Sequence, residues 1–273
     1  MSLSVRLLGS SSAGNCTVIW TDKTAILIDF GFPLRTILGG LAGCGLEWSH
    51  LRAAFITHLH GDHVRLPVLA ALRSHRVPVF GSIGMSARLM EKSGLPGEGS
   101  GDGMMWFSPG DMIDVGDLRV TGFDVPHDSP GGCCGYSITS RAHPEPRKLV
   151  LATDIGYPTR GAAAMFAGAA VMIIESNHDV RMLDRSGRPP ALIRRIKTVG
   201  HLSNDQCADL VMSALDQSEP PPQALILAHL SKECNTPDLA VRSATSCLRR
   251  SGLTGVHVHA AVPDCPGAVI TLH

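Results

Sequence analysis

Four potential metal ligands stand within six residues in one segment, Thr57-His58-Leu59-His60-Gly61-Asp62-His63. An apolar run at 51–56 precedes it and predicts a buried strand. His58 and His60 can converge on one cation from an extended chain, and we expect Asp62 and His63 to open the next helix and face a second cation. Imidazole nitrogen with carboxylate oxygen suits Zn²⁺ best and also accommodates Mn²⁺ or Fe. The alternatives are an exposed histidine-rich turn or one histidine that caps the helix.

Three further candidate ligands stand where a predicted strand gives way to a polar turn. They are His127, Asp154 and His229. Proteins with α/β layers place functional side chains in this way along one rim of a sheet. Taken alone, a strand-end Asp often caps a turn and a lone His is often an ordinary surface side chain. Together with the first cluster, the three residues predict a metal centre at that rim.

The elements that must position these residues follow from the hydrophobic pattern. Short β-branched or Leu-rich runs predict strands at 5–8, 16–20, 25–29, 53–57, 77–80, 118–125, 135–139, 149–153, 171–175, 224–228 and 255–262. Helical spacing predicts helices at 64–75, with Pro67 in the first turn, at 205–216 and at 236–250. The sum is a layered α/β protein with many strands.

Composition limits the classes of partner. Hydrophobic residues make up 44% of the 273 residues, enough for a substantial core. The runs 94–103 and 218–222 are loop-like but lie between ligands that must meet, so we expect a single domain over 1–273. Lys plus Arg and Asp plus Glu number 24 each, so any polyanion must be held by a local patch or by the metals.

The cysteines and the first residues predict a cytoplasmic protein. The eight cysteines form no Cys-x-x-Cys pair, and the chain enters a predicted strand without a signal peptide. No apolar run approaches the roughly 20 residues that span a bilayer, so we expect no membrane partner. The sequence leaves the oligomeric state open.

The ligand order resembles that of the metallo-β-lactamase superfamily, and Ile26-Leu27-Ile28-Asp29-Phe30-Gly31 is similar to its early Asp-Gly motif. The resemblance spans nearly the whole chain and implies a four-layer αββα sandwich with a two-metal site at its rim. It implies one metal held by His58, His60 and His127, the other held by Asp62, His63 and His229, and Asp154 as the bridge between them. It also implies that Asp29 supports the metal-binding loop from behind.

The presence of aspartate at both Asp62 and Asp154 resembles the phosphodiesterase branches of the superfamily more than the true β-lactamases. The same ligands also serve lactonases and glyoxalase-type thioesterases, so they do not decide the substrate. The cofactors implied are two divalent cations, Zn²⁺ or Mn²⁺ with Fe as a further candidate. Such a pair would lower the pKa of a bridging water and clamp both oxygens of a phosphoryl displacement.

Two motifs outside the ligand set narrow the reaction. Glu175 follows a predicted strand and His201 stands in Gly200-His201-Leu202-Ser203-Asn204, and both resemble motifs of ribonuclease Z-like nucleases, where a Glu–His pair helps to protonate the leaving oxygen. A carboxylate beside an imidazole favours the protonated ring, so we expect His201 to act as general acid while Asp62 orients the attacking hydroxide. The alternative is that Glu175 ends a strand and His201 caps the next helix.

Longer motifs indicate a subfamily. The segments 9–16, 175–179, 200–204 and 228–233 resemble the WalJ/YycJ-type proteins, which are associated with 5′-to-3′ exonuclease activity on DNA. We therefore expect a phosphodiesterase that acts on DNA through a metal-bridging hydroxide, with RNA as a further partner. The alternatives are a hydrolase of small or cyclic phosphodiesters and a non-enzymatic, nucleic-acid-binding regulatory module on the same scaffold.

Two segments are candidates for holding substrate. The loop 10–15 can cradle a phosphate with its backbone amides, or it can be a hairpin turn. A basic cluster at 181–197 supplies a local positive patch, or it is a solvated helix face. The side chains expected to contact substrate are Ser11, Ser12, Asn15, Asn177, Arg194, Arg195 and Lys232.

Overall fold

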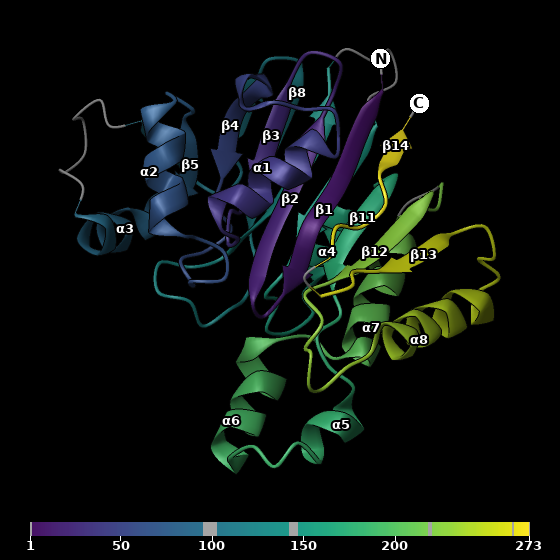
Figure 1. Cartoon of the computed structure of the whole chain (residues 1–273). Coiled ribbons are helices and arrows are strands. Elements are labelled where there is room, and N and C mark those ends of the chain that lie inside the picture. Colours follow the sequence, from purple (N-terminus) through teal and green to yellow (C-terminus); the bar gives the residue numbers. More distant parts are fainter. Residues whose placement is uncertain (1, 95–102, 142–146, 218–219, 264, 273) are drawn as a thin grey trace.

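Two seven-stranded sheets packed face to face form the centre of the computed structural model (Figure 1). The structure describes all residues except 1, 95–102, 142–146, 218–219, 264 and 273. The first sheet has the order β14 (Ile270–Leu272), β1 (Leu3–Ser11), β2 (Gly14–Trp20), β3 (Ala25–Ile28), β4 (Leu51–Phe55), β5 (Val79–Ser82) and β6 (Met104–Phe107). The second has the order β13 (His257–Ala260), β12 (Ala224–Ala228), β11 (Val171–Glu175), β10 (Lys148–Ala152), β9 (Cys134–Ser140), β8 (Leu118–Asp124) and β7 (Met112–Val115).

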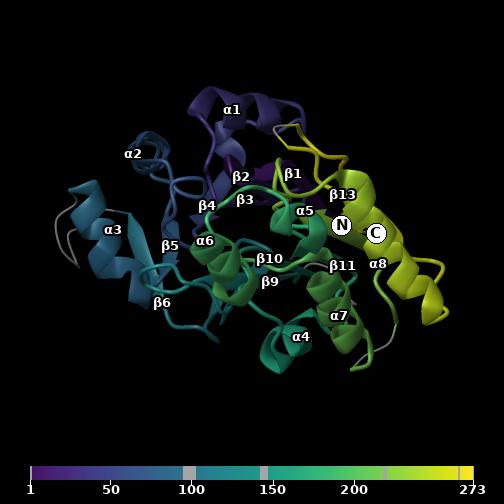
Figure 2. The ribbon, with the colours of Figure 1, turned by 90° about the horizontal axis from the view of Figure 1, so that it is seen from below.

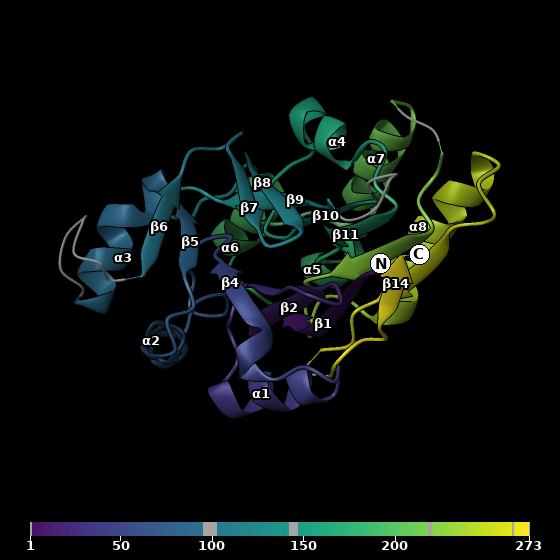
Figure 3. The same ribbon diagram turned by 90° about the horizontal axis from the view of Figure 1, so that it is seen from above.

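Helices flank the two sheets, some on the outer faces and others beside the ends of the strands. They are α1 (Leu34–Ala42), α2 (Leu66–Ser74), α3 (Ser86–Ser93), α4 (Arg160–Phe166), α5 (Val180–Asp184), α6 (Pro190–Arg195), α7 (Asn204–Leu215) and α8 (Pro237–Arg250), with single turns η1 (Trp48–His50), η2 (Ile83–Met85) and η3 (Ile196–Gly200). Figure 3 shows α1 on the outside of the first sheet and α4 and α7 on the outside of the second. The expected four-layer αββα architecture is confirmed. No helix in the described part of the chain is long and apolar enough to cross a membrane.

Alternation along the strands explains why the second sheet is apolar on both faces. In β11, Val171 and Ile173 belong to the core between the sheets, whereas Met172 and Ile174 belong to the core beneath the helices. Successive side chains of a strand point to opposite faces, so a strand covered on both sides reads as a continuous apolar run. The inner core therefore joins the two sheets, and the outer core binds α4, α7 and α8 to the second sheet.

Six strands bring their carboxyl ends to one rim. β3 and β4 are parallel in the first sheet, and β10, β11 and β12 are parallel in the second. β8 is antiparallel to β9, which is antiparallel to β10, so β8 runs in the same direction as β10. The loops after these strands carry every predicted metal ligand. Figure 2 views this rim from below, with α5 and α6 beside it.

The predicted helix start at Asp62 and His63 is wrong. Both residues lie in a turn, closed by hydrogen bonds from the His63 and Val64 amides to the His60 carbonyl at 3.1 and 3.0 Å, and α2 begins only at Leu66. A helix from Asp62 would place Pro67 in its interior, where the ring clashes with the carbonyl four residues earlier. The eleven predicted strands all overlap observed strands, but the short edge strands β6, β7 and β14 were not predicted. Residues 95–102 and 218–219 of the predicted loops lie outside the described residues.

Gly31 allows the chain after β3 to lie flat against the ligand loop. A Cβ atom at Gly31 would stand 1.7 Å from the carbonyl oxygen of Asp62. The same loop is fastened by the Asn15 amide, which donates to that carbonyl at 2.7 Å, and by the Phe30 amide, which donates to the His63 carbonyl at 2.9 Å. The spacing between Gly31 and Asp62 thus sets the position of two predicted ligands.

We predict that Gly31→Ala destabilises the protein by roughly 1–3 kcal/mol, because the methyl group must displace backbone. Gly39→Ala is the matched control: it lies on the exposed face of α1 with no atom within 4 Å of the new methyl group, and it should stabilise by about 0.5–1 kcal/mol. Urea unfolding of both variants measures the difference. Equal midpoints for the two would contradict the packing argument.

Candidate metal centre

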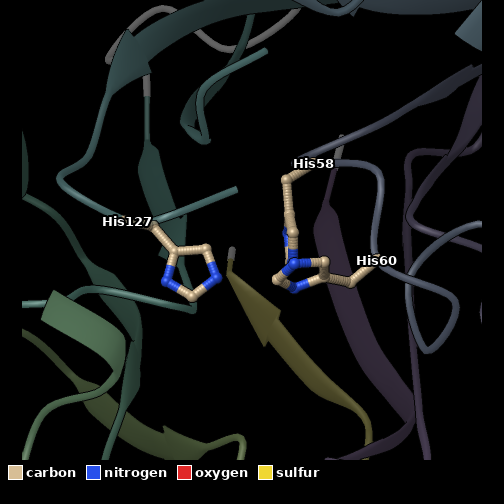
Figure 4. Close-up of side chains that lie close together, drawn as sticks. All are labelled: His58, His60 and His127. Atoms are coloured by element: carbon tan, nitrogen blue, oxygen red, sulfur yellow. The ribbon is translucent and has the colours of Figure 1, made fainter. Parts of the chain in front are cut away.

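Three histidines from two loops face one point. His58 and His60 follow β4, and His127 follows β8 and lies across from them (Figure 4). Their ring centroids are 4.6 Å apart for His58 and His60, 5.1 Å for His58 and His127, and 5.3 Å for His60 and His127. One nitrogen of each ring lies within 4.8 Å of the others, so a single cation can contact all three.

A second group lies beside the first and shares Asp154 with it. The Nε2 atoms of His63 and His229 lie 3.5 and 3.6 Å from Oδ2 of Asp62. Asp154 stands between the groups, with Oδ2 3.2 Å from Nε2 of His63 and Oδ1 3.9 Å from Nε2 of His127. The structure thus brings all seven predicted ligands together at the rim.

The donor set fits a divalent cation. Four atoms of the cluster are buried without a hydrogen-bond partner: Nε2 of His58, Nε2 of His127, Nε2 of His229 and Oδ2 of Asp154. Burying such atoms unpaired costs roughly 1–3 kcal/mol each. A divalent cation would contact them directly, and histidine nitrogen with aspartate oxygen is a set that Zn²⁺ and Mn²⁺ accept.

The ligand rings are held from behind through their other nitrogen. Nδ1 of His63 lies 2.7 Å from Oδ2 of Asp29, Nδ1 of His127 lies 2.9 Å from the Gly200 carbonyl, and Nδ1 of His229 lies 2.9 Å from Oε1 of Glu175. A ring that donates from Nδ1 presents an unprotonated Nε2, which is the form that binds metal. The protein therefore fixes both the orientation and the tautomer that coordination requires.

Asp29 lies where the resemblance implies, beneath the ligand loop. Its Oδ1 accepts the Thr57 amide and its Oδ2 accepts the Thr57 hydroxyl, both at 2.8 Å. The Thr57 hydroxyl oxygen in turn lies 3.2 Å from Nδ1 of His58 and 3.1 Å from Nδ1 of His63. Thr57 therefore links the buried carboxylate to the start of the histidine cluster, a role that its residue type alone does not reveal.

Backbone strain is concentrated at the site. Asp29, Asp154 and His229 have φ angles of 59°, 56° and 55°, and Arg76 is the one other described residue besides glycine with a positive φ. This conformation costs roughly 1–3 kcal/mol for a residue with a side chain. Packing around the rim stabilises it, and the sharp bend aims each of these side chains at the cluster.

The predicted ligands differ in their charge state. Burial, aided by neighbouring imidazoles, lowers the pKa of His58 well below its usual value, and burial lowers the pKa of His60, so both rings stay neutral. Burial opposes ionisation of Asp62 and Asp154, but the surrounding histidines hold the pKa of both carboxyl groups well below the usual range.

Burial opposes protonation of His63 and His229, but Asp154 and the neighbouring carboxylates outweigh it. The pKa of His63 rises well above its usual value, and the pKa of His229 rises to about 10. Without a cation these two rings carry a proton, which a divalent metal would displace.

The predicted contact between Glu175 and His201 is present. Oε1 of the buried Glu175 lies 2.8 Å from Nδ1 of His201. Burial lowers the pKa of His201, but the Glu175 carboxylate outweighs burial and raises it overall. The alternative role of His201 as a helix cap is wrong, since Ser203 caps α7 by accepting the Gln206 amide at 3.2 Å.

Glu175 does more than the sequence indicates. The same Oε1 holds the predicted ligand His229, and Oε2 accepts the amides of Ile155 and Leu202 at 2.7 and 3.1 Å. With Asp154 and His201 these side chains form another group close enough to hold a cation. Because both oxygens of Glu175 are already engaged by donors, this carboxylate is better suited to orienting the two histidines than to binding metal.

The loop 10–15 is the hairpin turn between β1 and β2, with Ser11 opposite Gly14. Ser11 is buried and Ser12 is exposed. The side-chain nitrogen Nδ2 of Asn15 lies 2.9 Å from the Ser11 carbonyl and 3.0 Å from Nε2 of His63. The hydroxyl of Ser10 accepts the His229 amide at 2.9 Å, a contact that the sequence could not predict across 219 residues.

The remaining predicted substrate contacts divide into buried and exposed residues. Asn177 is buried, and its side-chain amide donates to the His229 carbonyl at 2.8 Å. Arg194, Arg195 and Lys232 are exposed. The Arg195 guanidinium donates to Asp128, the residue after a predicted ligand. Asn177 therefore holds the backbone of the site, whereas the three cations face outward beside it.

Ion pairs with acidic residues reduce the net positive charge of the basic cluster at 181–197. Arg188 pairs with Glu233 at 2.7 Å and Lys197 with Asp184 at 2.5 Å. In the described part of the chain, three exposed cations of this cluster make no ion pair and can meet an external anion: Arg181, Arg185 and Arg194.

Comparisons with known proteins agree with this geometry. A family model described as a beta-lactamase superfamily domain matches residues 24–229. Exodeoxyribonuclease YycJ of Bacillus anthracis is 32% identical over 97% of this chain and 98% of its own, and exodeoxyribonuclease WalJ of Streptococcus pneumoniae is 30% identical over 94% and 92%. The metallo-beta-lactamase fold protein YhfI from Bacillus subtilis superposes with a TM-score of 0.71 at 16% identity, with both chains fully covered.

The proposed ligand roles predict a separation between metal content and rate. Asp154→Ala should lose most bound metal after reloading with Zn²⁺ or Mn²⁺, because the residue contacts both groups. His201→Ala should keep the parent's metal content, because Glu175 still orients His229. Plasma mass spectrometry of desalted protein gives the stoichiometry. Full metal retention in Asp154→Ala would show that this residue is no ligand.

Proposed function

Because this chain belongs to the metallo-β-lactamase superfamily, and within it to the group of YycJ and WalJ, we propose that it is a dinuclear metal-dependent phosphodiesterase that removes nucleotides from a 5′ end of DNA. His58, His60 and His127 would hold one cation, Asp62, His63 and His229 the other, and Asp154 both. Bound Zn²⁺ or Mn²⁺, with Fe as a further candidate, supplies Lewis-acid activation of water and neutralises charge on the phosphate.

The observation that carries this proposal is the place of His201. Its Nδ1 is bound to Glu175 and lies 3.6 Å from Oδ1 of Asp154, at the edge of the ligand cluster. Nε2 is the ring nitrogen left to meet a substrate. Hydrolysis of a phosphodiester expels an alkoxide that needs a proton, and an imidazole whose pKa is raised by a carboxylate can supply one. Hydrolysis of an acyl substrate would leave this pair without an evident role.

Asp62 is suited to act on the attacking water. Its side chain is 23% exposed, more than that of Asp154 at 2%, so a water molecule can reach it. The neighbouring histidines keep the carboxylate ionised although burial opposes this, and an ionised carboxylate accepts a hydrogen bond and orients the water. His201 and Asp62 would thus serve opposite ends of the displacement.

DNA as substrate rests on the two relatives named exodeoxyribonucleases and on the cations at the rim. Arg194 and Lys232 are exposed near the site, and Arg195 lies against the loop of His127. With 24 basic and 24 acidic residues overall, binding would depend on these local charges and on the metals.

A gel assay tests the function directly. We expect the metal-reloaded protein to shorten the 5′-phosphorylated strand of a DNA duplex progressively, and Asp154→Ala to leave it intact. Single-stranded DNA, 5′-hydroxyl DNA, RNA and a cyclic dinucleotide run in parallel define the preference. Cleavage of the cyclic dinucleotide alone would replace the nuclease by a small-diester hydrolase, and silence on every substrate together with DNA binding would favour a regulatory module.

The role of His201 predicts a dependence on the leaving group. His201→Ala should slow DNA cleavage by about 10²–10⁴-fold, the usual contribution of a general acid. Hydrolysis of bis(p-nitrophenyl) phosphate should fall far less, because nitrophenolate leaves without protonation. Steady-state rates on the two substrates give the comparison, and an equal loss on both would remove His201 from the role of acid.

A further inference from the structure

A pocket opens beside the half-buried ligand His60. Its volume is about 570 Å³, within the range of roughly 300–1,000 Å³ that small-molecule sites occupy. Leu59, His60, Arg88, Glu91, Lys92 and Pro130 line it. The pocket therefore lies between α3 and the loops that carry the three histidines of Figure 4.

One face of α3 supplies its charges. Arg88, Glu91 and Lys92 are spaced by three and four residues, which places them on the same side of a helix. Arg88 pairs with Glu91 at 2.9 Å, and the Lys92 ammonium donates to the Leu59 carbonyl at 3.0 Å. Two cations and one carboxylate leave this face a net charge of +1. Lys92 uses one of its three donors on the protein and keeps two for a ligand.

The pocket is held rigidly against the metal centre. A Cβ atom at Gly84, in the turn η2 that leads into α3, would stand 2.7 Å from the Gly131 carbonyl oxygen. Gly131 has a φ of 90°, and it follows His127 by four residues. Two glycines thus let η2 lie directly on the loop after His127. On the other side, Lys92 is tied to the residue between His58 and His60.

We propose that this pocket binds a phosphate group of the substrate strand next to the scissile one, with Lys92 and Arg88 on the phosphate and with Leu59 and Pro130 against the attached nucleoside. The inference rests on the proposed nuclease function and deepens it. A terminal 5′-phosphate and an internal phosphodiester offer the same chemistry to these cations.

Opposite charge changes on α3 test the inference. Arg88→Gln should raise the KM for DNA about fivefold, leave kcat within about twofold, and lower the slope of log KM against log salt by about 1. Glu91→Gln should lower KM, because it removes the carboxylate that competes for Arg88. Arg249→Gln, on α8 at the opposite end of the molecule from α3, is the matched control and should change neither quantity (Figure 1).

Comparison of two DNA substrates distinguishes a terminal 5′-phosphate from an internal phosphodiester as the group that the pocket binds. An effect of Arg88→Gln confined to 5′-phosphorylated DNA assigns the terminal phosphate, and an equal effect on 5′-hydroxyl DNA assigns an internal diester. Unchanged KM and salt slope in both α3 variants would overturn the proposal.

If the parent protein cuts no nucleic acid, the proposed function fails, and the pocket is judged separately by calorimetry. Deoxyadenosine 5′-monophosphate binding to the metal-loaded protein should be several-fold weaker in Arg88→Gln than in Arg249→Gln. Equal affinity in the two variants would overturn the pocket assignment as well.

Discussion

Two buried carboxylates, one at the end of a strand in each sheet, organise the centre. Asp29 follows β3 and fixes Thr57 and His63, whereas Glu175 ends β11 and fixes His229 and His201. A buried ionised group must be paired with hydrogen-bond donors, and the oxygens of each of these carboxylates accept hydrogen bonds from groups at the site. Their position behind the predicted ligands therefore joins two strand ends into one candidate metal centre.

The fold makes this meeting possible because the strands that carry the ligands run in one direction. The inner core between the sheets joins β3 and β4 to β10, β11 and β12, so the loops at their carboxyl ends face each other across the rim. Strained residues at three of these ends turn the side chains inward. This arrangement leaves several predicted ligand atoms buried without hydrogen-bond partners, which destabilises the folded protein. A bound cation would offset that loss.

Residue type and spacing were enough to find the ligand candidates and the layered fold. Clustered histidines after an apolar strand, and single polar residues at later strand ends, can be recognised in the sequence alone. The sharing of one Glu175 oxygen by His201 and His229 could not be predicted, because it depends on two loops 26 and 54 residues away. Asn15 and Asn177 were expected to contact substrate, but their side chains lie against His63 and the His229 carbonyl. A short amide side chain can form hydrogen bonds with buried protein groups as readily as with a substrate.

Anomalous diffraction from crystals loaded with Mn²⁺ or Zn²⁺ shows most directly which side chains hold metal. We expect two peaks roughly 3.5–4 Å apart. One should lie among His58, His60 and His127, the other among Asp62, His63 and His229, with Asp154 touching both. A single peak, or a peak bound by Glu175 and His201, would contradict the assignment of ligands and the separate role of the Glu175–His201 pair.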